Sequence, residues 1–122
     1  MKIEIPLLTR PKKNSQKIWY NPRTKRTMIV QSDTYMQFER DCAYFMPKLK
    51  EPIDRPVNLK CTFYVPDRRK RDLTNLENAI ADILVKYKVL KDDDYTIVAG
   101  WDGSRVIYEK GAEKTIIEIE EV

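Results

Sequence analysis

The chain has 122 residues, of which 42% are apolar and 34% are charged, a balance typical of one soluble domain with a single core. It contains no histidine, which excludes Ser–His and Cys–His nucleophilic catalysis and histidine-ligated zinc. Any catalysis would therefore depend on carboxylates, lysine, tyrosine or a bound hard cation.

The net charge of +4 is unevenly distributed. Residues 1–71 contain 17 Lys and Arg against 7 Asp and Glu, whereas residues 72–122 contain 6 against 12. This segregation favours a polyanion bound at one place and a cation at another, although a soluble protein with an uneven surface would also show it.

No segment has the apolar length of a membrane span, and residues 1–13 lack the continuous apolar stretch of a signal peptide. We therefore expect a cytoplasmic protein. In that reducing compartment Cys42 and Cys61 are expected to be buried thiols and not a disulfide.

The first half of the chain predicts a short strand, a basic hairpin and a helix. Residues 2–5 alternate as a strand, and residues 10–26 contain seven basic and no acidic residues. Asn21-Pro22 is a turn signal between strands expected at 16–20 and 26–30.

A helix is expected next, capped by Ser32 or Asp33 and ended by Pro47. Glu39 and Arg40 are expected on its outer side. Its apolar stripe is expected to be buried and comprises Tyr35, Met36, Phe38, Cys42, Ala43, Phe45 and Met46.

Residues 57–65 form the clearest strand, because apolar and polar residues alternate throughout. A second helix is expected at about 75–88, with Thr74 as its N-cap. Its apolar positions recur at helical spacing and are Leu76, Ala79, Ile80, Ile83, Leu84 and Tyr87.

The remaining chain predicts strands at 95–101, 104–108 and 114–120, the second being a hairpin partner of the first across Asp102-Gly103. The expected fold class is α+β. Residues 1–122 would form one domain with a mixed, antiparallel-rich sheet and two helices packed on one side.

Candidate chemistry gathers around the second helix. Asp72 precedes it, and Asn75, Asn78 and Asp82 share one helical face. Three consecutive aspartates, Asp92 to Asp94, follow the helix. If strand 95–101 lies beside strand 57–65, Asp93 is expected to approach Asp72.

The acidic run has two interpretations. It could be a solvated turn whose charges are screened by water. Alternatively, two aspartates from separate elements could hold Mg²⁺, which prefers oxygen ligands, lowers the pKa of a bound water and neutralises charge on a phosphate.

A basic run directly precedes Asp72 and comprises Arg68, Arg69, Lys70 and Arg71. Such a run could be a solvated, salt-bridged face. Beside a carboxylate, however, cations that hold backbone phosphate are what a phosphodiesterase needs. Neither basic segment has a bidentate base-reading pattern, which argues against a sequence-specific repressor.

The stretch from Arg68 to Tyr95 resembles the RusA-type Holliday junction resolvases, the endodeoxyribonuclease RusA family. Asp72, Asn75 and Asp82 match the first block of the family signature, and Asp92 and Asp93 match its terminal acidic pair. The general layout of the family fits the whole chain.

The resemblance implies a homodimeric, Mg²⁺-dependent endonuclease, with Mn²⁺ able to substitute, that cuts four-way DNA junctions in recombination and repair. It implies that Asp72, Asp93 and Asp82 are catalytic. The metal ligands would be Asp72, Asp93 and Asp92. Many members are carried by prophages, which makes a phage origin plausible.

Two positions depart from the family pattern. Thr74 stands where the family has its second aspartate, and Asn78 where it has lysine. Asp94 or Asp102 could supply a missing ligand. The supporting residues would then be Thr74, Asn75, Asn78 and Asp94.

Three functions remain open from the sequence. The first is a nuclease whose DNA-binding residues are Arg68, Arg69, Lys70, Arg71, Lys12, Lys13, Arg23, Lys25 and Arg26. The second is a catalytically weak or inactive protein that binds branched DNA. The third is an interaction protein whose acidic C-terminal part recruits a partner, which predicts no salt-dependent DNA affinity.

Overall fold

The computed structural model of the chain describes residues 1–12, 16–31 and 33–122. These residues form a five-stranded mixed sheet, a separate two-stranded hairpin and two α-helices. The expected α+β class is confirmed. Two residues named above, Lys13 and Ser32, lie outside the described part of the chain.

The large sheet is built around its two long central strands. Its order is β1 (Lys2–Ile5), β7 (Lys114–Glu121) and β4 (Val57–Val65), and β7 runs antiparallel to both neighbours. Along the other edge of β4 lie β5 (Val98–Gly100) and then β6 (Arg105–Tyr108), both parallel to β4.

The strand predicted at 95–101 begins only at Val98, because Asp94 holds the preceding residues in a turn. The N–H groups of Ile97 and Val98 donate to the carbonyl oxygen of Asp94 at 3.0 and 2.8 Å. Residues enclosed in this turn do not pair with β4 as a regular strand.

The predicted hairpin across Asp102-Gly103 is wrong, because β6 pairs with β4 and continues along the edge that β5 begins. Asn58 of β4 fixes the step between them. Its side-chain oxygen accepts from the Asp102 N–H at 2.8 Å, and its amide donates to the Asp102 carbonyl at 3.1 Å.

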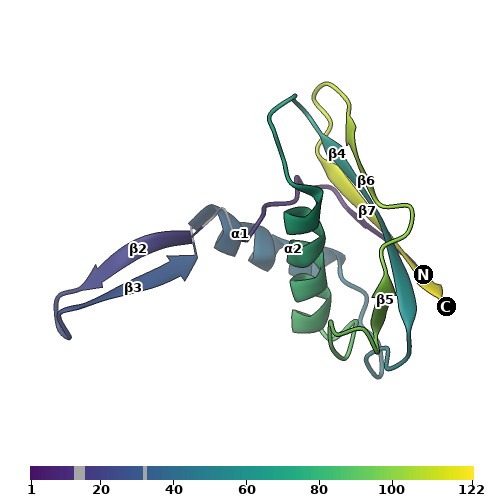
Figure 1. Cartoon of the computed structure of the whole chain (residues 1–122), viewed down its shortest axis with the longest axis horizontal. Coiled ribbons are helices and arrows are strands. Elements are labelled where there is room, and N and C mark those ends of the chain that lie inside the picture. Colours follow the sequence, from purple (N-terminus) through teal and green to yellow (C-terminus); the bar gives the residue numbers. More distant parts are fainter. Residues whose placement is uncertain (13–15, 32) are drawn as a thin grey trace.

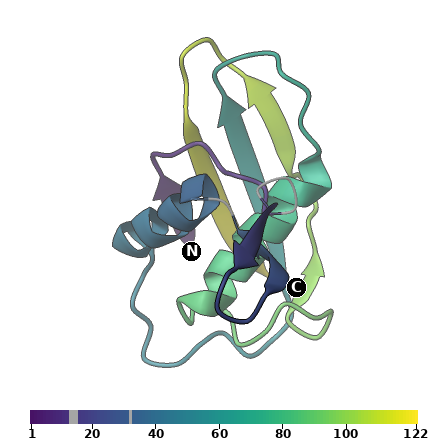
Figure 2. The same cartoon turned by 90° about the vertical axis from the view of Figure 1, so that its left-hand side faces the viewer.

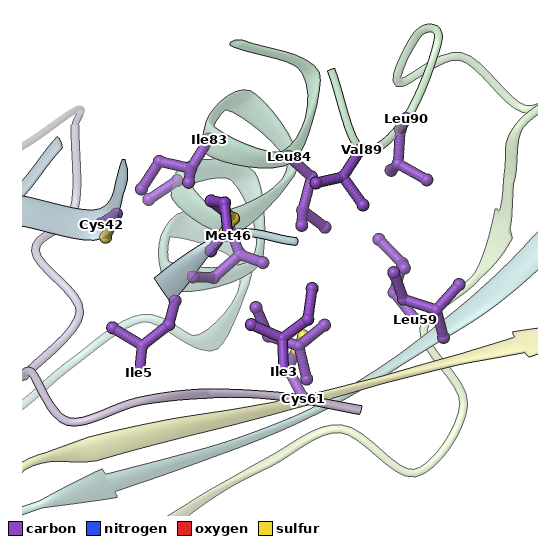
Figure 3. Close-up of a cluster of buried hydrophobic side chains, with 14 of the residues drawn as sticks. Ile3, Ile5, Cys42, Met46, Leu59, Cys61, Ile83, Leu84, Val89 and Leu90 are labelled. Carbon is purple, nitrogen blue, oxygen red and sulfur yellow. The ribbon is translucent and has the colours of Figure 1, made fainter. Parts of the chain in front are cut away.

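Both helices, α1 (Asp33–Cys42) and α2 (Leu73–Lys86), cover the same face of the large sheet, as expected (Figures 1 and 2). The alternation of β4 explains this arrangement, because all five of its apolar side chains are buried and face the helices. Figure 3 shows the side chains of Ile83 and Leu84 on α2 facing the sheet. Both cysteines are free and buried, as expected.

Helix α2 begins two residues earlier than predicted, and the prediction that Thr74 is its N-cap is wrong. Asp72 is the cap: its backbone is extended, with φ −98° and ψ 115°, and its Oδ1 accepts from the Thr74 N–H at 3.0 Å. An aspartate at this position also interacts favourably with the positive end of the helix dipole.

The burial expected for the stripe of α1 is only partly correct. Tyr35, Phe38 and Cys42 are buried, as is Met46 beyond the helix. Met36, Ala43 and Phe45 are exposed instead. The helix ends at Cys42, and a 3-10 turn, η2 (Ala43–Phe45), changes the spacing that had predicted one continuous face.

Glu39 was expected on the outer side of α1, but it joins the two helices. Its carboxylate pairs with Lys86 of α2, and its carbonyl accepts from the Tyr87 hydroxyl at 2.6 Å. Among the described residues, neither helix has the length and apolar character that crossing a membrane requires.

The expected basic hairpin is confirmed as β2 (Gln16–Asn21) and β3 (Arg26–Gln31), paired antiparallel. Figure 1 shows it extending away from the sheet and helices. At its tip, the Lys25 N–H donates to the Asn21 carbonyl at 2.8 Å, and Lys25 adopts a left-handed φ of 56°.

Candidate metal centre and nucleic-acid interface

The loop between β4 and α2 carries the basic run, and Arg71 gives this loop its shape. The Arg71 guanidinium donates to Asp67 Oδ1 at 2.9 Å, and its side chain is only 16% exposed. This hydrogen bond, followed by one from the Arg69 N–H, lowers the pKa of Asp67. Arg71 is therefore largely engaged within the protein.

The other three cations of the run are presented outward. Arg68 lies over the ring of Tyr108, with its guanidinium carbon 4.7 Å from the ring centroid. The Arg69 side chain is 85% exposed, and Lys70 is exposed as well. These three side chains form the surface that we call the basic loop.

Asp72 lies at the junction of the basic loop and α2. It lines an open hollow of about 660 Å³ together with Lys70, Arg71 and Asn75. One of its oxygens already caps the helix, which leaves the carboxylate beside cations at the helix start.

A cluster of acids forms where α2 passes the turn that follows it. Burial raises the pKa of Asp93, and the neighbouring carboxylates of Asp92 and Asp82 raise it further. Asp92 Oδ1 also accepts from the Asp93 N–H at 2.7 Å. We call Asp82, Asp92 and Asp93 the acidic cluster.

Asp94 has a different role. Its side chain accepts from the Thr96 N–H at 2.8 Å and from the Thr96 hydroxyl, and these bonds lower its pKa. Its carboxylate therefore stabilises the turn that leads into β5.

One cation reaches the acidic cluster from the N-terminal part of the chain. Lys12 Nζ lies 3.6 Å from Asp82 Oδ2, with both side chains partly exposed. Sequence reasoning assigned Lys12 to the DNA-binding hairpin region. Nothing in the basic run from 10 to 26 distinguishes this lysine from its neighbours, so the sequence contained no signal for the contact.

The polar strip of α2 is present as expected. Asn78 is exposed, and Asn75 and Asp82 are partly buried beside the apolar face of the helix. Asn78 and Asp82 are one helical turn apart and therefore neighbours on the surface.

The structure does not bring Asp72 close to Asp93 within one chain. Asp72 follows the end of β4 and starts α2, whereas Asp93 precedes β5, which pairs with the beginning of β4. The intervening helix has 14 residues and spans about 21 Å. Figure 1 shows the turn after α2 at the opposite end of the helix from its first turn. The expected strand pairing exists, but its parallel direction separates the two acids.

The donor set of the acidic cluster nevertheless fits a hard divalent cation. The neighbouring carboxylates of Asp92 and Asp82 help to raise the pKa of Asp93, a repulsion that a bound cation would relieve. Mg²⁺ commonly uses one or two carboxylates, with water and phosphate completing its shell. Within the described ranges, no three acidic or thiol side chains converge on one point. The protein's carboxylate oxygens would therefore supply only part of the coordination shell of such an ion.

A third group of cations lies at the tip of the β2–β3 hairpin. Arg23, Lys25 and Arg26 are all exposed there, as the assignment to DNA binding requires. The Arg23 N–H donates to Asn21 Oδ1 at 3.0 Å, which orders the turn.

Exposed cations on a loop and a hairpin, together with acids near the end of α2, are features expected of a protein that acts on nucleic-acid backbones. The chain belongs to the endodeoxyribonuclease RusA family, whose sequence pattern matches residues 9–120. The match includes the acidic cluster, the basic loop and the hairpin. No curated protein matches the chain.

Proposed function

We propose that this protein is a Mg²⁺-dependent endonuclease that resolves Holliday junctions or other branched DNA during recombination and repair. The observation that carries the proposal is the acidic cluster with Lys12 beside it, in a chain of the endodeoxyribonuclease RusA family. Mn²⁺ has the same preference for oxygen ligands and would substitute.

Asp82, Asp92 and Asp93 would hold the metal ion. When bound, the ion supplies a water of lowered pKa and neutralises charge developing on the phosphate. The carboxylates orient the ion. Lys12, already 3.6 Å from Asp82, would turn its ammonium group toward a phosphate oxygen of the scissile strand.

The basic loop would hold the same strand. Arg68 is positioned by its contact with Tyr108, and Arg69 and Lys70 are exposed enough to follow the DNA backbone. The hairpin tip would hold a junction arm. These contacts read phosphate and not base edges, which suits a protein that recognises DNA shape.

Asp72 would act at the other end of α2, where it faces the strand held by the basic loop. The resemblance assigns it to the metal. Within one chain, however, Asp72 lies at the opposite end of α2 from the acidic cluster, too far away to bind an ion held by that cluster. Measuring the metal affinity of Asp72 variants distinguishes the two roles.

A homodimer would supply the second cut. A four-way junction has two-fold symmetry and two strands of like polarity, so two identical sites related by a two-fold axis match it. Each chain contains one acidic cluster and would contribute one site.

A second candidate is a protein that binds branched DNA and cuts it slowly or not at all. Thr74 and Asn78, where the family has aspartate and lysine, favour this alternative, because one carboxylate and one cation are missing from the family pattern.

The decisive experiment incubates the protein with a labelled four-way junction and with a linear duplex of the same sequence, each with and without Mg²⁺. We expect paired nicks in the junction only when Mg²⁺ is present, and none with Asp93→Asn. Retarded but intact junction at all Mg²⁺ concentrations would establish the binding protein instead.

A further inference from the structure

The β2–β3 hairpin presents aromatic and apolar side chains together with cations. Trp19 is 46% exposed, Tyr20 is 56% exposed and Met28 is 47% exposed. Residues 16–31 contain four Lys and Arg and no Asp or Glu. Figure 1 shows this hairpin extending away from the sheet and helices. Exposed aromatic rings combined with positive charge are the features by which proteins bind unpaired nucleic acid.

The strand register places Trp19 and a cation on the same face of the hairpin. Trp19 pairs with Met28, and Asn21 pairs with Arg26. Because paired residues point to the same side and alternate residues share a face, these four form one face, which we call the Trp19 face. Arg26 is exposed and is the diagonal neighbour of Trp19, about 7–8 Å away along the sheet. A nucleotide whose base lies on the Trp19 ring would have its phosphate within reach of Arg26.

The opposite face of the hairpin differs in charge. Ile18 pairs with Ile29 and Tyr20 pairs with Thr27, so this face carries apolar and uncharged polar residues. Because affinity for a DNA backbone depends on cations, a DNA strand would select the Trp19 face. Tyr20, an aromatic residue of comparable exposure on the uncharged side, provides a matched control for Trp19.

The chemistry of stacking defines which form of DNA the Trp19 face can bind. In a duplex the bases are stacked on one another and present only their edges in the grooves. A tryptophan ring can therefore stack only on a base that has left the duplex. Such bases occur in the single-stranded arms of branched DNA and are scarce in a fully paired four-way junction.

We infer that the Trp19 face binds unpaired bases of a single-stranded arm next to a DNA branch, with Trp19 stacking on a base and Arg26 contacting its phosphate. A fork or a flap with a single-stranded arm would then be a better substrate than a fully paired four-way junction. The substrate preference rests on the proposed function, whereas the binding is argued from the hairpin alone.

The first test compares the affinities for a labelled oligothymidylate and for a labelled duplex by fluorescence anisotropy. Trp19→Ala should weaken oligothymidylate binding by about ten-fold, as the loss of one stacked base implies, and duplex binding much less. Trp19→Phe keeps an aromatic ring and should retain most of the affinity. Tyr20→Ala should bind oligothymidylate as wild type does. Equal losses for Trp19→Ala and Tyr20→Ala, or for the two DNAs, would overturn the inference.

A second measurement reports stacking directly. The chain has two tryptophans, so Trp101→Phe leaves Trp19 as the sole tryptophan fluorophore. Oligothymidylate should quench its fluorescence as binding saturates. Unchanged fluorescence at saturation would place the bases elsewhere and refute the inference. A change of molecular mass caused by Trp19→Ala, with oligothymidylate affinity unaltered, would assign the face to a protein contact and would refute it as well.

The nuclease proposal fails separately. A protein that binds oligothymidylate through Trp19 but never nicks branched DNA would refute the activity and leave this inference standing. A protein that nicks branched DNA, with the same affinities in Trp19→Ala as in wild type, would do the reverse. If both proposals hold, Trp19→Ala should lower the cleavage of a fork with a single-stranded arm more than the cleavage of a fully paired four-way junction.

Discussion

Individual side chains in the acidic cluster experience two opposing influences. The partial burial of Asp93 and the like charges of Asp92 and Asp82 disfavour the ionisation of Asp93. Lys12, whose Nζ lies 3.6 Å from Asp82 Oδ2, offsets part of the negative charge of the cluster. A site with this balance, short of positive charge and rich in oxygen, is suited to a divalent cation and a DNA phosphate arriving together.

Asp93→Asn should stabilise the metal-free protein at neutral pH. Because the pKa of Asp93 is raised in the folded state, its contribution to stability is complete below the usual aspartate pKa and is lost as pH rises through the raised value. Calorimetry should show a higher Tm for the variant at pH 7, with the difference shrinking toward pH 4.

Metal binding should reverse this order. Mg²⁺ at one hundred times its Kd would stabilise wild type by about 2.7 kcal/mol, and Asp93→Asn should lose most of that gain. An equal Mg²⁺-induced rise in Tm for both proteins would remove Asp93 from the metal site.

Lys12→Met should slow junction cleavage without lowering stability appreciably, since the partly exposed Lys12–Asp82 pair contributes at most about 1 kcal/mol. Lys60→Met is a matched control, because Lys60 lies 3.7 Å from Glu118 with similar exposure on the other side of the sheet. Single-turnover rates should fall for the first variant only.

Adding Asn78→Lys to Lys12→Met provides a rescue test. Asn78 lies one turn from Asp82 on α2, so a lysine there would restore an ammonium group at the cluster. We expect partial recovery of the rate. In the wild-type background Asn78→Lys should change little, because Lys12 already supplies the charge.

At the scale of elements, α2 connects the two functional regions. Its first turn carries Asp72 beside the basic loop, and its later turns carry Asp82 into the acidic cluster. Its buried side fixes the helix against β4, which sets both ends relative to the sheet.

Substitutions of Asp72 should separate capping from chemistry. Asp72→Ala removes the cap and should destabilise the fold by about 1 kcal/mol, whereas Asp72→Asn, a good N-cap, should not. Both should reduce cleavage and leave Mg²⁺-induced stabilisation intact. Loss of that stabilisation in Asp72→Asn would show that Asp72 ligates the ion, as the family resemblance implies.

At the scale of the whole molecule, the grouped cations of the basic loop and of the hairpin tip lie apart from the acidic cluster. The basic loop and the hairpin tip each bring three exposed cations together. The outer face of the large sheet carries mixed charges, including Lys60 with Glu118 and Lys114 over the ring of Tyr64. A DNA backbone should therefore prefer the basic loop and the hairpin tip to the outer face of the sheet.

Neutralising the basic loop should therefore weaken DNA binding more than an equal loss of positive charge elsewhere on the surface. Arg68→Gln with Arg69→Gln and Lys70→Gln should flatten the dependence of log affinity on log salt by about 0.9 for each phosphate that is no longer neutralised. The control replaces Lys2, Lys60 and Lys114 with Gln, an equal change in net charge on the sheet. Equal slopes for the two triple variants would place the DNA elsewhere.

Sequence periodicity alone determined most elements of the fold. The strict alternation of residues 57–65 and the helical stripe of α2 already show which side chains of each element are buried, and the folded structure buries them. The basic hairpin was predictable for the same reason, because its turn chemistry is local. The absence of histidine limits the possible chemistry through composition alone.

Long-range geometry was decided only by the tertiary structure. Sequence spacing cannot give the direction of strand pairing, and the parallel pairing of β5 with β4 is what places Asp93 far from Asp72. The contact between Lys12 and Asp82 joins residues 70 positions apart and has no local signature. Patterns within a few residues follow from backbone geometry, whereas the grouping of charges depends on how distant segments pack.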